Sequence, residues 1–452
     1  MRLILPVLFL MFLPHAVWAQ QTLTLQDAIR ISLENNFQLK QAENNLSLSG
    51  MEVTSAYAEF LPNLSASFGG NQNVGRQFIQ EDLTFEDRTT YGMSGGLQAS
   101  VTIFSGFENI NNLRRSRVVQ TQQVADTDRI RENIIFDTAM RYLQVLLDIE
   151  LLDIAEQNLE TSQVQLNQVE AQVEVGSRPV VDLYQQQSTV ASNEVQVVQA
   201  ENSVNISRTR LIRMLQVDPL QDIEFSIPDF DESDLAPRDL DLEEMIQLAL
   251  SNRKDMEAME LEILASRYDL DIARANKYPR VTASANLSSR YSDQYQIVDP
   301  ATNQPIRATF GDQFFEQMIQ RSAGFSISIP IFNRWNTNVS IQQARIQHRN
   351  ARLSLDDIRY GIREEISQAY NDYSSLVKEL EATERSLQAA ERAYETQQQR
   401  YDIGAASLIE LNQATTDYME AMSSRQQVIY NFVFQEKLLD YYIGRITDDV
   451  SL

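Results

Sequence analysis

Apolar and polar residues alternate along this chain with two different periods, which follow one another in a fixed order. Near the beginning, the apolar positions that recur every four residues are Leu25, Ile29, Leu33 and Phe37. This spacing predicts an amphipathic helix that begins at a Thr24 cap, continues to about Phe60 and ends before Pro62. The same pattern returns between Asp241 and Pro279.

After each proline the period changes to two, which is typical of strands with one apolar and one polar face. The apolar series are Leu64, Ala66, Phe68; Leu97, Ala99, Val101, Ile103; Val281, Ala283, Ala285, Leu287; and Phe325, Ile327, Ile329, Ile331. The residues between them are mainly Ser, Thr, Gln, Asn and Gly. We therefore predict four strands, at about residues 63–70, 92–103, 280–291 and 323–331.

Apolar residues three and four apart, and then seven apart, predict long coiled-coil helices. One such arm carries Leu152, Ala155, Leu159, Ser162, Leu166, Val169 and Val173, and the returning arm carries Leu183, Val190, Val197, Val204 and Leu211. A helix from about Gly106 to Val175 would be roughly 105 Å long at 1.5 Å per residue. Because many seam positions are Ser, Ala, Gln or Thr, each seam is narrow, and we expect neighbouring hairpins to pack side by side.

The order helix, strand, loop, strand, long helix, turn, helix occurs twice, and the two copies align by subtraction. Pro62 matches Pro279 at an offset of 279 − 62 = 217, and Gly176 matches Gly404 at 404 − 176 = 228. The offset changes between the two strands of a copy, so one loop there tolerates insertion. A duplicated unit is the expected organisation.

The beginning of the chain has the composition of a cleavable secretory signal, with Arg2, an apolar run and the small residue Ala19. A membrane-anchoring helix is the alternative, but the run is shorter than the ~18 apolar residues of a spanning helix. We therefore divide the chain into a signal peptide at 1–19, a first repeat at 20–235 and a second repeat at 236–452. No later stretch is apolar enough to span a bilayer as a helix, so membrane insertion must use strands.

Composition excludes several classes of function. The chain has no cysteine, which excludes disulfides, thiolate catalysis and a lipid-modified cysteine. His348 is the one histidine after the predicted signal, so imidazole catalysis and the usual zinc sites are almost excluded. The net charge of −25 argues against a nucleic-acid partner. We expect no enzymatic activity, no cofactor and no metal.

The strand pattern alone also fits half-buried strands of a soluble protein. Two observations favour a membrane sheet instead. Aromatic residues are dense between Tyr278 and Trp335, as in the girdles of transmembrane barrels, and the rest of the chain is nearly all coiled coil. Four strands cannot close a barrel. Two chains would give eight strands and an interior filled by side chains, whereas three chains would give 12 strands and room for water. The small polar residues facing inward favour that wet interior, and hence a homotrimer.

Three pairs of motifs recur in order: LTLQDAIRISLENN and LDLEEMIQLALSNR, VTIFSGFEN and IPIFNRWNT, VEVGSRPVVDLYQ and YDIGAASLIELNQ. On these motifs the chain resembles the TolC-like outer-membrane efflux protein family over essentially its whole mature length. The resemblance implies a mainly α-helical protein with membrane β-strands, in which a trimeric 12-stranded β-barrel stands on an α-helical periplasmic tunnel. It places the protein in the outer membrane of a Gram-negative-type bacterium, in contact with outer-membrane lipid.

The same resemblance implies a passive export duct of a tripartite efflux or type I secretion system. Its partners would be a periplasmic adaptor (membrane fusion protein) and an inner-membrane pump or ABC transporter. The alternative is a structural periplasmic coiled-coil or adaptor protein without a barrel. That alternative explains the heptads but not the four alternating strands.

By this resemblance, the two glycine turns form the periplasmic tip. Each glycine also has the simpler role of ending a helix in a left-handed conformation. The residues expected to dock the adaptor are Val175, Gly176, Ser177, Ile403, Gly404 and Ala405. The residues expected at the tip constriction and its gate are Asp182, Tyr401, Glu410, Gln413 and Arg178.

Within the gate, Tyr401 is expected to hydrogen-bond Asp182. Threefold symmetry would turn Asp182 and Glu410 each into a ring of three carboxylates with raised pKa values, although each is also an ordinary solvated acid near the start of a helix. The family pattern has a second acid where this chain has Gln413. It also has an arginine where this chain has Ala406, and Arg178 is a possible substitute.

Overall fold

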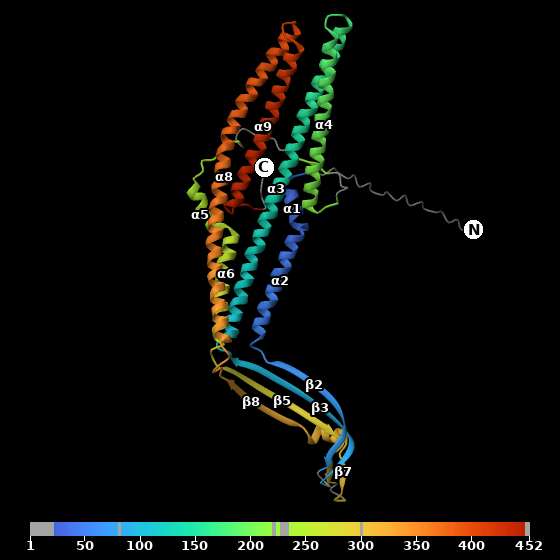
Figure 1. The fold of residues 1–452 in the computed structure, drawn as a ribbon, viewed down its shortest axis with the longest axis vertical. Coiled ribbons are helices and arrows are strands. Elements are labelled where there is room, and N and C mark those ends of the chain that lie inside the picture. Colours follow the sequence, from blue (N-terminus) through green and yellow to red (C-terminus); the bar gives the residue numbers. More distant parts are fainter. Residues whose placement is uncertain (1–21, 80–82, 219–222, 227–234, 299–301, 448–452) are drawn as a thin grey trace, which may run out of the picture. The chain divides into compact units, whose positions relative to one another are not determined.

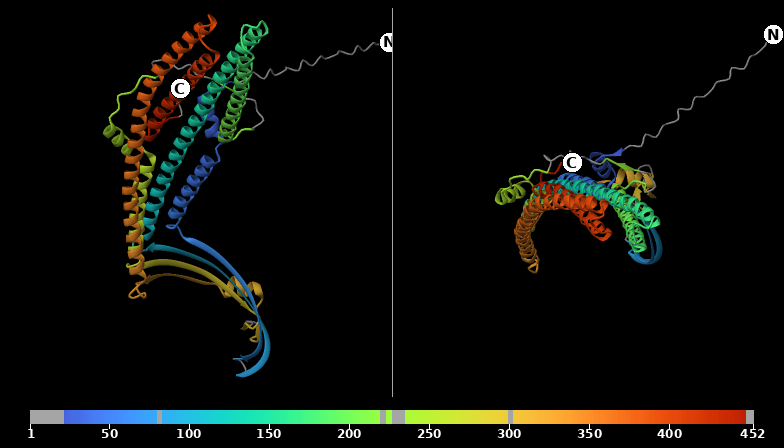
Figure 2. Two further views of the ribbon diagram at one scale, coloured as in Figure 1. Left: turned by 45° about the horizontal axis from the view of Figure 1, so that its top comes forward. Right: turned by 90° about the horizontal axis from the view of Figure 1, so that it is seen from above.

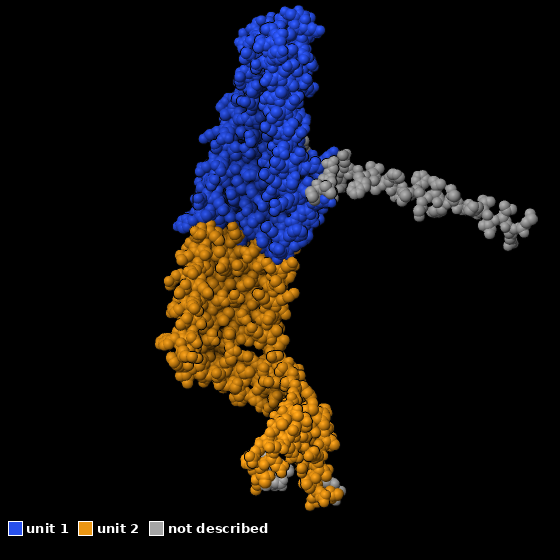
Figure 3. Space-filling model, turned by 45° about the vertical axis from the view of Figure 1, so that its right-hand side comes forward, with its two compact units in different colours: residues 1–42, 127–254, 359–452 blue, residues 43–126, 255–358 orange. Residues whose placement is uncertain are grey.

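The computed structural model describes residues 22–79, 83–218, 223–226, 235–298 and 302–447. The predicted signal peptide lies outside the described residues. Contacts divide the chain into two compact units, coloured separately in Figure 3. The first unit comprises residues 1–42, 127–254 and 359–452, and the second comprises 43–126 and 255–358. Each unit draws on both sequence repeats, so the repeats themselves are not the compact units and stay a prediction from the sequence.

The helices and strands follow the predicted order twice, which confirms a chain of long helices with a small sheet (Figure 1). The first series is α1 (Leu25–Asn35), α2 (Phe37–Ala58), β2 (Asn63–Ile79), β3 (Thr84–Phe104), α3 (Glu108–Glu174) and α4 (Val180–Leu215). The second is α5 (Leu242–Asn252), α6 (Lys254–Ala275), β5 (Arg280–Ser292), β8 (Gln320–Ser328), α8 (Asn336–Asp402) and α9 (Leu408–Tyr442). None of the helices within the described ranges is both long and apolar enough to cross a membrane.

The single helix expected from Thr24 to Phe60 is wrong, because it is interrupted at Asn36. This residue leaves the helical region with ψ 122°, and its side-chain oxygen accepts hydrogen bonds from the amides of Gln38 (2.8 Å) and Leu39 (3.2 Å). Asn36 thus caps α2 instead of continuing α1. The second copy is interrupted at the equivalent residue, Arg253.

The second unit holds one antiparallel sheet with the strand order β2-β3-β5-β8. In the left-hand view of Figure 2 its strands curve together. The pairing sets Leu64 opposite Ala99 and Ala99 opposite Ala285, so the apolar positions of all four strands share one face. The small polar positions share the other face, as the alternation indicates.

The strands differ in length from those expected. β2 continues beyond the predicted end at position 70, and β3 starts before the predicted position 92. Backbone pairing between them extends through glycines and asparagines, where the alternation of apolar and polar side chains stops. β8 begins at Gln320 and ends at Ser328, two residues before Pro330, which has no amide hydrogen to donate to a ladder.

The loop before β8, for which the sequence predicts no structure, contains four short elements: β6 (Gln296–Val298), β7 (Pro305–Arg307), α7 (Phe310–Asp312) and the π-helical turn η1 (Gln313–Gln317). Phe314 of η1 packs on the apolar face of the sheet, 5.4 Å from the ring of Phe68. A Cβ at Gly95 would lie 2.8 Å from both rings, so glycine makes room for this contact.

A large cluster of buried apolar side chains lies in the first unit, where the helices carry bulky residues in place of small seam residues. Its fully buried members include Ile29, Leu146 and Leu211. A two-stranded parallel pair, β1 (Thr22–Leu23) with β4 (Glu224–Phe225), covers it. The buried hydroxyl of Tyr142 lies 2.8 Å and 2.9 Å from the carbonyl oxygens of Leu23 and Ser226, which ties this pair to α3.

Candidate functional site at the helix-hairpin tips

The turns between α3 and α4 and between α8 and α9 have the same backbone. Gly176 and Gly404 have φ angles of +74° and +75°. In the first turn the amides of Gly176 and Ser177 donate to carbonyls of the preceding helix over 2.9 Å each, and in the second Gly404 and Ala405 do so over 3.0 and 2.7 Å. This paired arrangement ends a helix on a left-handed glycine.

Both turns present bare apolar side chains. Val175 is 78 % exposed and Ile403 is 80 % exposed. Nothing lies within 4 Å of a Cβ built at either glycine, so the turn backbone is also open. Four further exposed apolar residues follow the turns, and the sequence analysis did not predict them as part of this surface: Val180, Val181, Tyr184 and Ile409. They begin new helices, where an apolar residue outside the heptad seam gives no signal of its own.

The expected hydrogen bond from Tyr401 to Asp182 is not formed, because Arg178 lies between them. The guanidinium carbon of Arg178 is 4.1 Å from the centre of the Tyr401 ring, and its Nη1 is 3.5 Å from Asp182 Oδ2. The Tyr401 hydroxyl is buried and has no hydrogen-bond partner among the described residues. Burial raises the pKa of that hydroxyl, and Arg178 opposes the rise.

Tyr401 sits in a small apolar cluster that joins the two arms of its hairpin to the other hairpin. The cluster also contains Val169, Ala406, Leu408 and Leu411. Ala406, which replaces the arginine of the family pattern, is nearly buried there. Ala406 therefore adds to the apolar packing of the tip, whereas an arginine would have added an ionic contact.

Glu410 is occupied within its own turn. Its Oε2 accepts hydrogen bonds from the Ser407 amide (2.7 Å) and hydroxyl (3.0 Å), and the Ser407 hydroxyl accepts from the Glu410 amide. This is a capping box at the start of α9. The hydrogen bonds from Ser407 hold the pKa of the Glu410 carboxyl below its usual range. Gln413, one turn later, donates to Asp417 on the same helix.

A polar bridge between the two hairpins, formed by Gln186 and Asn412, was not predicted from the sequence. Gln186 of α4 is fully buried, donates to the carbonyl of Ser162 (2.9 Å) and accepts from the side-chain amide of Asn412 on α9 (3.1 Å). Polar residues inside a coiled-coil seam fix its register. The two helices come from different repeats, so no sequence spacing reveals the pair. No cluster of three or more potential metal ligands occurs in the described parts of the chain.

Known proteins resemble this chain over most of its length. The family described as "Outer membrane efflux protein" matches residues 28–216 and 245–445, one block in each repeat. The pyoverdine export outer membrane protein OpmQ of Pseudomonas aeruginosa is 26 % identical over 270 residues, 59 % of this chain and 56 % of OpmQ. The chain therefore spans little more than half the length of OpmQ. Outer membrane protein TolC of Escherichia coli is 20 % identical over 89 % of this chain and 85 % of TolC.

Solved structures have the same fold. The outer membrane channel CmeC of Campylobacter jejuni superposes with a TM-score of 0.80 at 17 % identity, over 94 % of this chain and 87 % of CmeC. CusC gives a TM-score of 0.78 at 18 % identity, over 93 % and 92 % of the two chains. The two family blocks cover well over half of the sequence and contain all the long helices and the four-stranded sheet. The chain therefore belongs to the outer membrane efflux protein family.

Proposed function

We propose that three copies of this chain form a passive duct through which an efflux or secretion system exports its cargo across the outer membrane. One observation carries this proposal: apart from the contact of Phe314 with Phe68, the apolar face of the four-stranded sheet is exposed in the single chain. Phe68 is 71 % exposed and Phe325 is 76 % exposed in the single chain. Such a face is stable in lipid and not in water.

The edges of the sheet support the trimer. Within the described residues β2 and β8 each pair on one side only. A free edge carries unpaired amides and carbonyls, which hydrocarbon does not tolerate, so the sheet must close with other copies. Three copies give 12 strands and an interior wide enough for water, to which the polar face contributes Ser, Thr and Asn. A periplasmic coiled-coil protein without a barrel would leave the apolar face and both edges of this sheet in water, so the sheet argues against that alternative.

The two hairpin turns are proposed to receive the periplasmic adaptor. The exposed side chains of Val175 and Ile403 and the open backbone at Gly176 and Gly404 support this, since an apolar helix tip in water favours a partner. An inner-membrane pump or ABC transporter would supply the energy. The relatives are named for export of pyoverdine, for solvent and toluene efflux and for cation efflux. Because proteins of one family are named for such different cargoes, we propose that the pump, and not the duct, selects the cargo.

Native mass spectrometry of the protein in mild detergent tests the duct. The expected result is a complex of three chains that is extracted from outer-membrane fractions only with detergent and that conducts ions in planar bilayers. A single-chain mass, or extraction without detergent, overturns the proposal. Crosslinking in cells, with Val175 or Ile403 replaced by a photoreactive residue, then identifies the adaptor; no crosslink above that of the buried Leu211 position would contradict docking at the turns.

A further inference from the structure

The two hairpins of the sheet are structural equivalents at the same offsets that relate the two sequence copies. In the first hairpin Ser65 pairs with Gln98, and in the second Thr282 pairs with Ser326. The differences are 282 − 65 = 217 and 326 − 98 = 228. The β5–β8 register is therefore the β2–β3 register carried forward by the two offsets.

The junctions from β3 to α3 and from β8 to α8 are equivalent too. The Ser105 hydroxyl accepts from the Asn109 amide, and the side-chain oxygen of Asn333 accepts from the Thr337 amide, each over 3.5 Å. Both pairs lie 228 apart (333 − 105 and 337 − 109). Both junctions then use two left-handed residues, with φ angles of 67° at Gly106, 71° at Phe107, 54° at Arg334 and 66° at Trp335.

One contact of the sheet has no equivalent inside the chain. β3, the second strand of the first hairpin, pairs with β5, the first strand of the second hairpin. The equivalents of these strands are β8 and β2, which are the two edges of the sheet. A second copy of the chain is the one partner that offers the missing strand with the matching register.

Given the trimeric duct proposed above, we propose that β8 pairs with β2 of a second copy in the register that β3 and β5 use within one chain. The observed pair Ser100–Ser284 becomes Ser328 opposite Ser67 of the second copy (100 + 228 and 284 − 217). One residue along, Ile327 lies opposite Phe68. This register keeps apolar residues on one face and serines on the other, whereas a slip by one residue reverses the faces.

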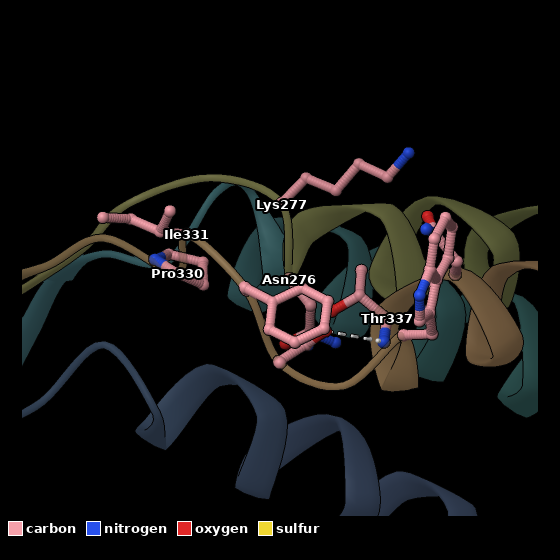
Figure 4. A pocket seen from close by; sticks show the side chains of 9 residues that line it. Asn276, Lys277, Pro330, Ile331 and Thr337 are labelled. Carbon is pink, nitrogen blue, oxygen red and sulfur yellow. Dashed lines mark hydrogen bonds between the residues drawn. The ribbon is translucent and has the colours of Figure 1, made fainter.

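Exposure at the junctions agrees with a missing neighbour. Ile103 in the first junction is 65 % exposed, and its equivalent Ile331 is 95 % exposed. The first junction is covered by the connection between α6 and β5: a Cβ at Gly106 would lie 2.5 Å from the carbonyl oxygen of Ala275. A recess of about 210 Å³ lies at the second junction. Lys277 and Ile331, both labelled in Figure 4, are among its lining residues. In the trimer, the second copy's connection between α2 and β2 covers this junction.

The two contacts cannot be identical, because Arg334 stands where Gly106 stands. A Cβ at this position prevents the close approach that Gly106 allows, so the seam between copies is wider than the seam within a chain. The connection that faces Arg334 carries Glu59 of the second copy. The Glu59 carboxylate accepts from Asn112 (3.0 Å) and has no cationic partner among the described residues, and Arg334 likewise has no anionic one. The proposed seam therefore includes an ion pair between Arg334 and Glu59 of the second copy.

Cysteine crosslinking tests the register, since the natural chain has no cysteine. Ser67→Cys combined with Ser328→Cys is expected to give a ladder up to a covalent trimer on a non-reducing gel. Ser67→Cys combined with Ser326→Cys, a slip of two residues, should give none, because diagonal Cα atoms are about 7–8 Å apart and disulfides need less than ~7 Å. Ser100→Cys combined with Ser284→Cys is the matched control and should oxidise within one chain.

The outcomes separate the register from the duct. A trimer by native mass spectrometry without the Ser67–Ser328 crosslink, while the control pair oxidises, overturns the register alone. A ladder from the slipped pair instead of the predicted pair does the same. A single-chain mass for the natural protein overturns the duct, and this inference with it.

Charge exchange tests the ion pair. Arg334→Glu and Glu59→Arg are each expected to lower the surviving trimer fraction about two- to fivefold at the temperature where half of the natural trimer dissociates, as for an exposed pair. The double exchange should restore most of the loss. Arg352→Glu makes the same charge change on an exposed face of α8 and should have no such effect. A double variant no better than either single variant overturns the ion pair.

Discussion

At the tip Arg178, not Tyr401, contacts Asp182. A buried tyrosine hydroxyl without a hydrogen bond weakens the tip, because burying an unsatisfied polar group costs about 1–3 kcal/mol. The guanidinium of Arg178 instead joins the two hairpins through the ring of Tyr401, 4.1 Å away, while Asp182 of its own hairpin, at 3.5 Å, holds the guanidinium in place. A partly buried cation–π contact is worth about 0.5–2 kcal/mol.

We expect Tyr401→Phe to leave the single-channel conductance unchanged and Arg178→Ala to raise the conductance or the open probability. Phe at position 401 keeps the ring that Arg178 contacts and removes only the unbonded hydroxyl, whereas Ala at position 178 removes the contact between the hairpins. Arg385→Ala, which breaks an exposed pair within α8, is the charge-matched control. If Tyr401→Phe opened the channel as far as Arg178→Ala, the hydroxyl would hold the gate in the assembled protein.

Glu410 gives the first turn of α9 a defined pH dependence. Its pKa is lowered in the folded protein by hydrogen bonds from Ser407, so the native carboxyl binds its proton more weakly than the unfolded one. The stabilisation is complete above the ordinary carboxyl range, near pH ~4.3, and is lost as the pH falls through the lowered pKa. Hydrogen exchange of the peptide spanning α9's first turn should therefore lose protection only in strong acid.

Ser407→Ala should produce the same loss at neutral pH. Removing an N-cap side chain costs about 0.5–2 kcal/mol, which predicts faster exchange in the first turn of α9 by roughly two- to thirtyfold. Thr416→Ala, in the same helix but beyond its first turns, is the control. Unchanged exchange in Ser407→Ala would show that the adjoining apolar cluster, not the cap, holds the turn.

The long helices and the faces of the strands could be predicted from the sequence, because each produces a regular spacing of apolar residues along the chain. The α3 helix was expected from Gly106 to Val175 and spans Glu108–Glu174. The interruption at Asn36 was not predicted because the apolar four-residue spacing continues across it, and its cause is a side chain that accepts hydrogen bonds from the backbone amides of Gln38 and Leu39. The placement of Arg178 on Tyr401 was missed for another reason: it depends on two hairpins meeting, which no period encodes.

The bridge between α4 and α9 gives a test of how the hairpins are joined. Asn412→Ala leaves the buried side-chain oxygen of Gln186 without the hydrogen bond that it accepts from Asn412 Nδ2 over 3.1 Å. A buried acceptor left unpaired costs about 1–3 kcal/mol. We expect faster hydrogen exchange in α4 around Gln186 and a lower thermal midpoint. Gln413→Ala removes a neighbouring side chain that bonds only within α9, and should change neither; equal effects of the two variants would contradict a specific bridge.

The negative charge of the whole molecule lowers the stability of its folded state at neutral pH. The net charge is −25 per chain. Burial raises the pKa values of Asp126, Asp137, Glu150 and Glu436, with Glu262 adding to the effect at Asp126 and Asp153 at Glu150. A carboxyl whose pKa is raised in the folded state binds its proton more tightly there than in the unfolded chain. Such a group therefore adds stability as the pH falls through its raised pKa, down to the ordinary value near ~4.

We expect the detergent-solubilised protein to be more heat-stable at pH 5 than at pH 7.5, by roughly 2–4 °C in low salt. Salt at 0.5 M should remove the part that comes from surface repulsion, since the screening length then falls to about 4 Å, and leave the part that comes from burial. Asp126→Asn should raise the midpoint at pH 7.5 and shrink the gain at pH 5, because the amide is never charged. Asp357→Asn, on an exposed stretch of α8, should leave the gain intact. A midpoint that falls between pH 7.5 and pH 5 would mean that ion pairs such as Arg425–Glu384, whose carboxyl pKa is lowered, outweigh the buried acids.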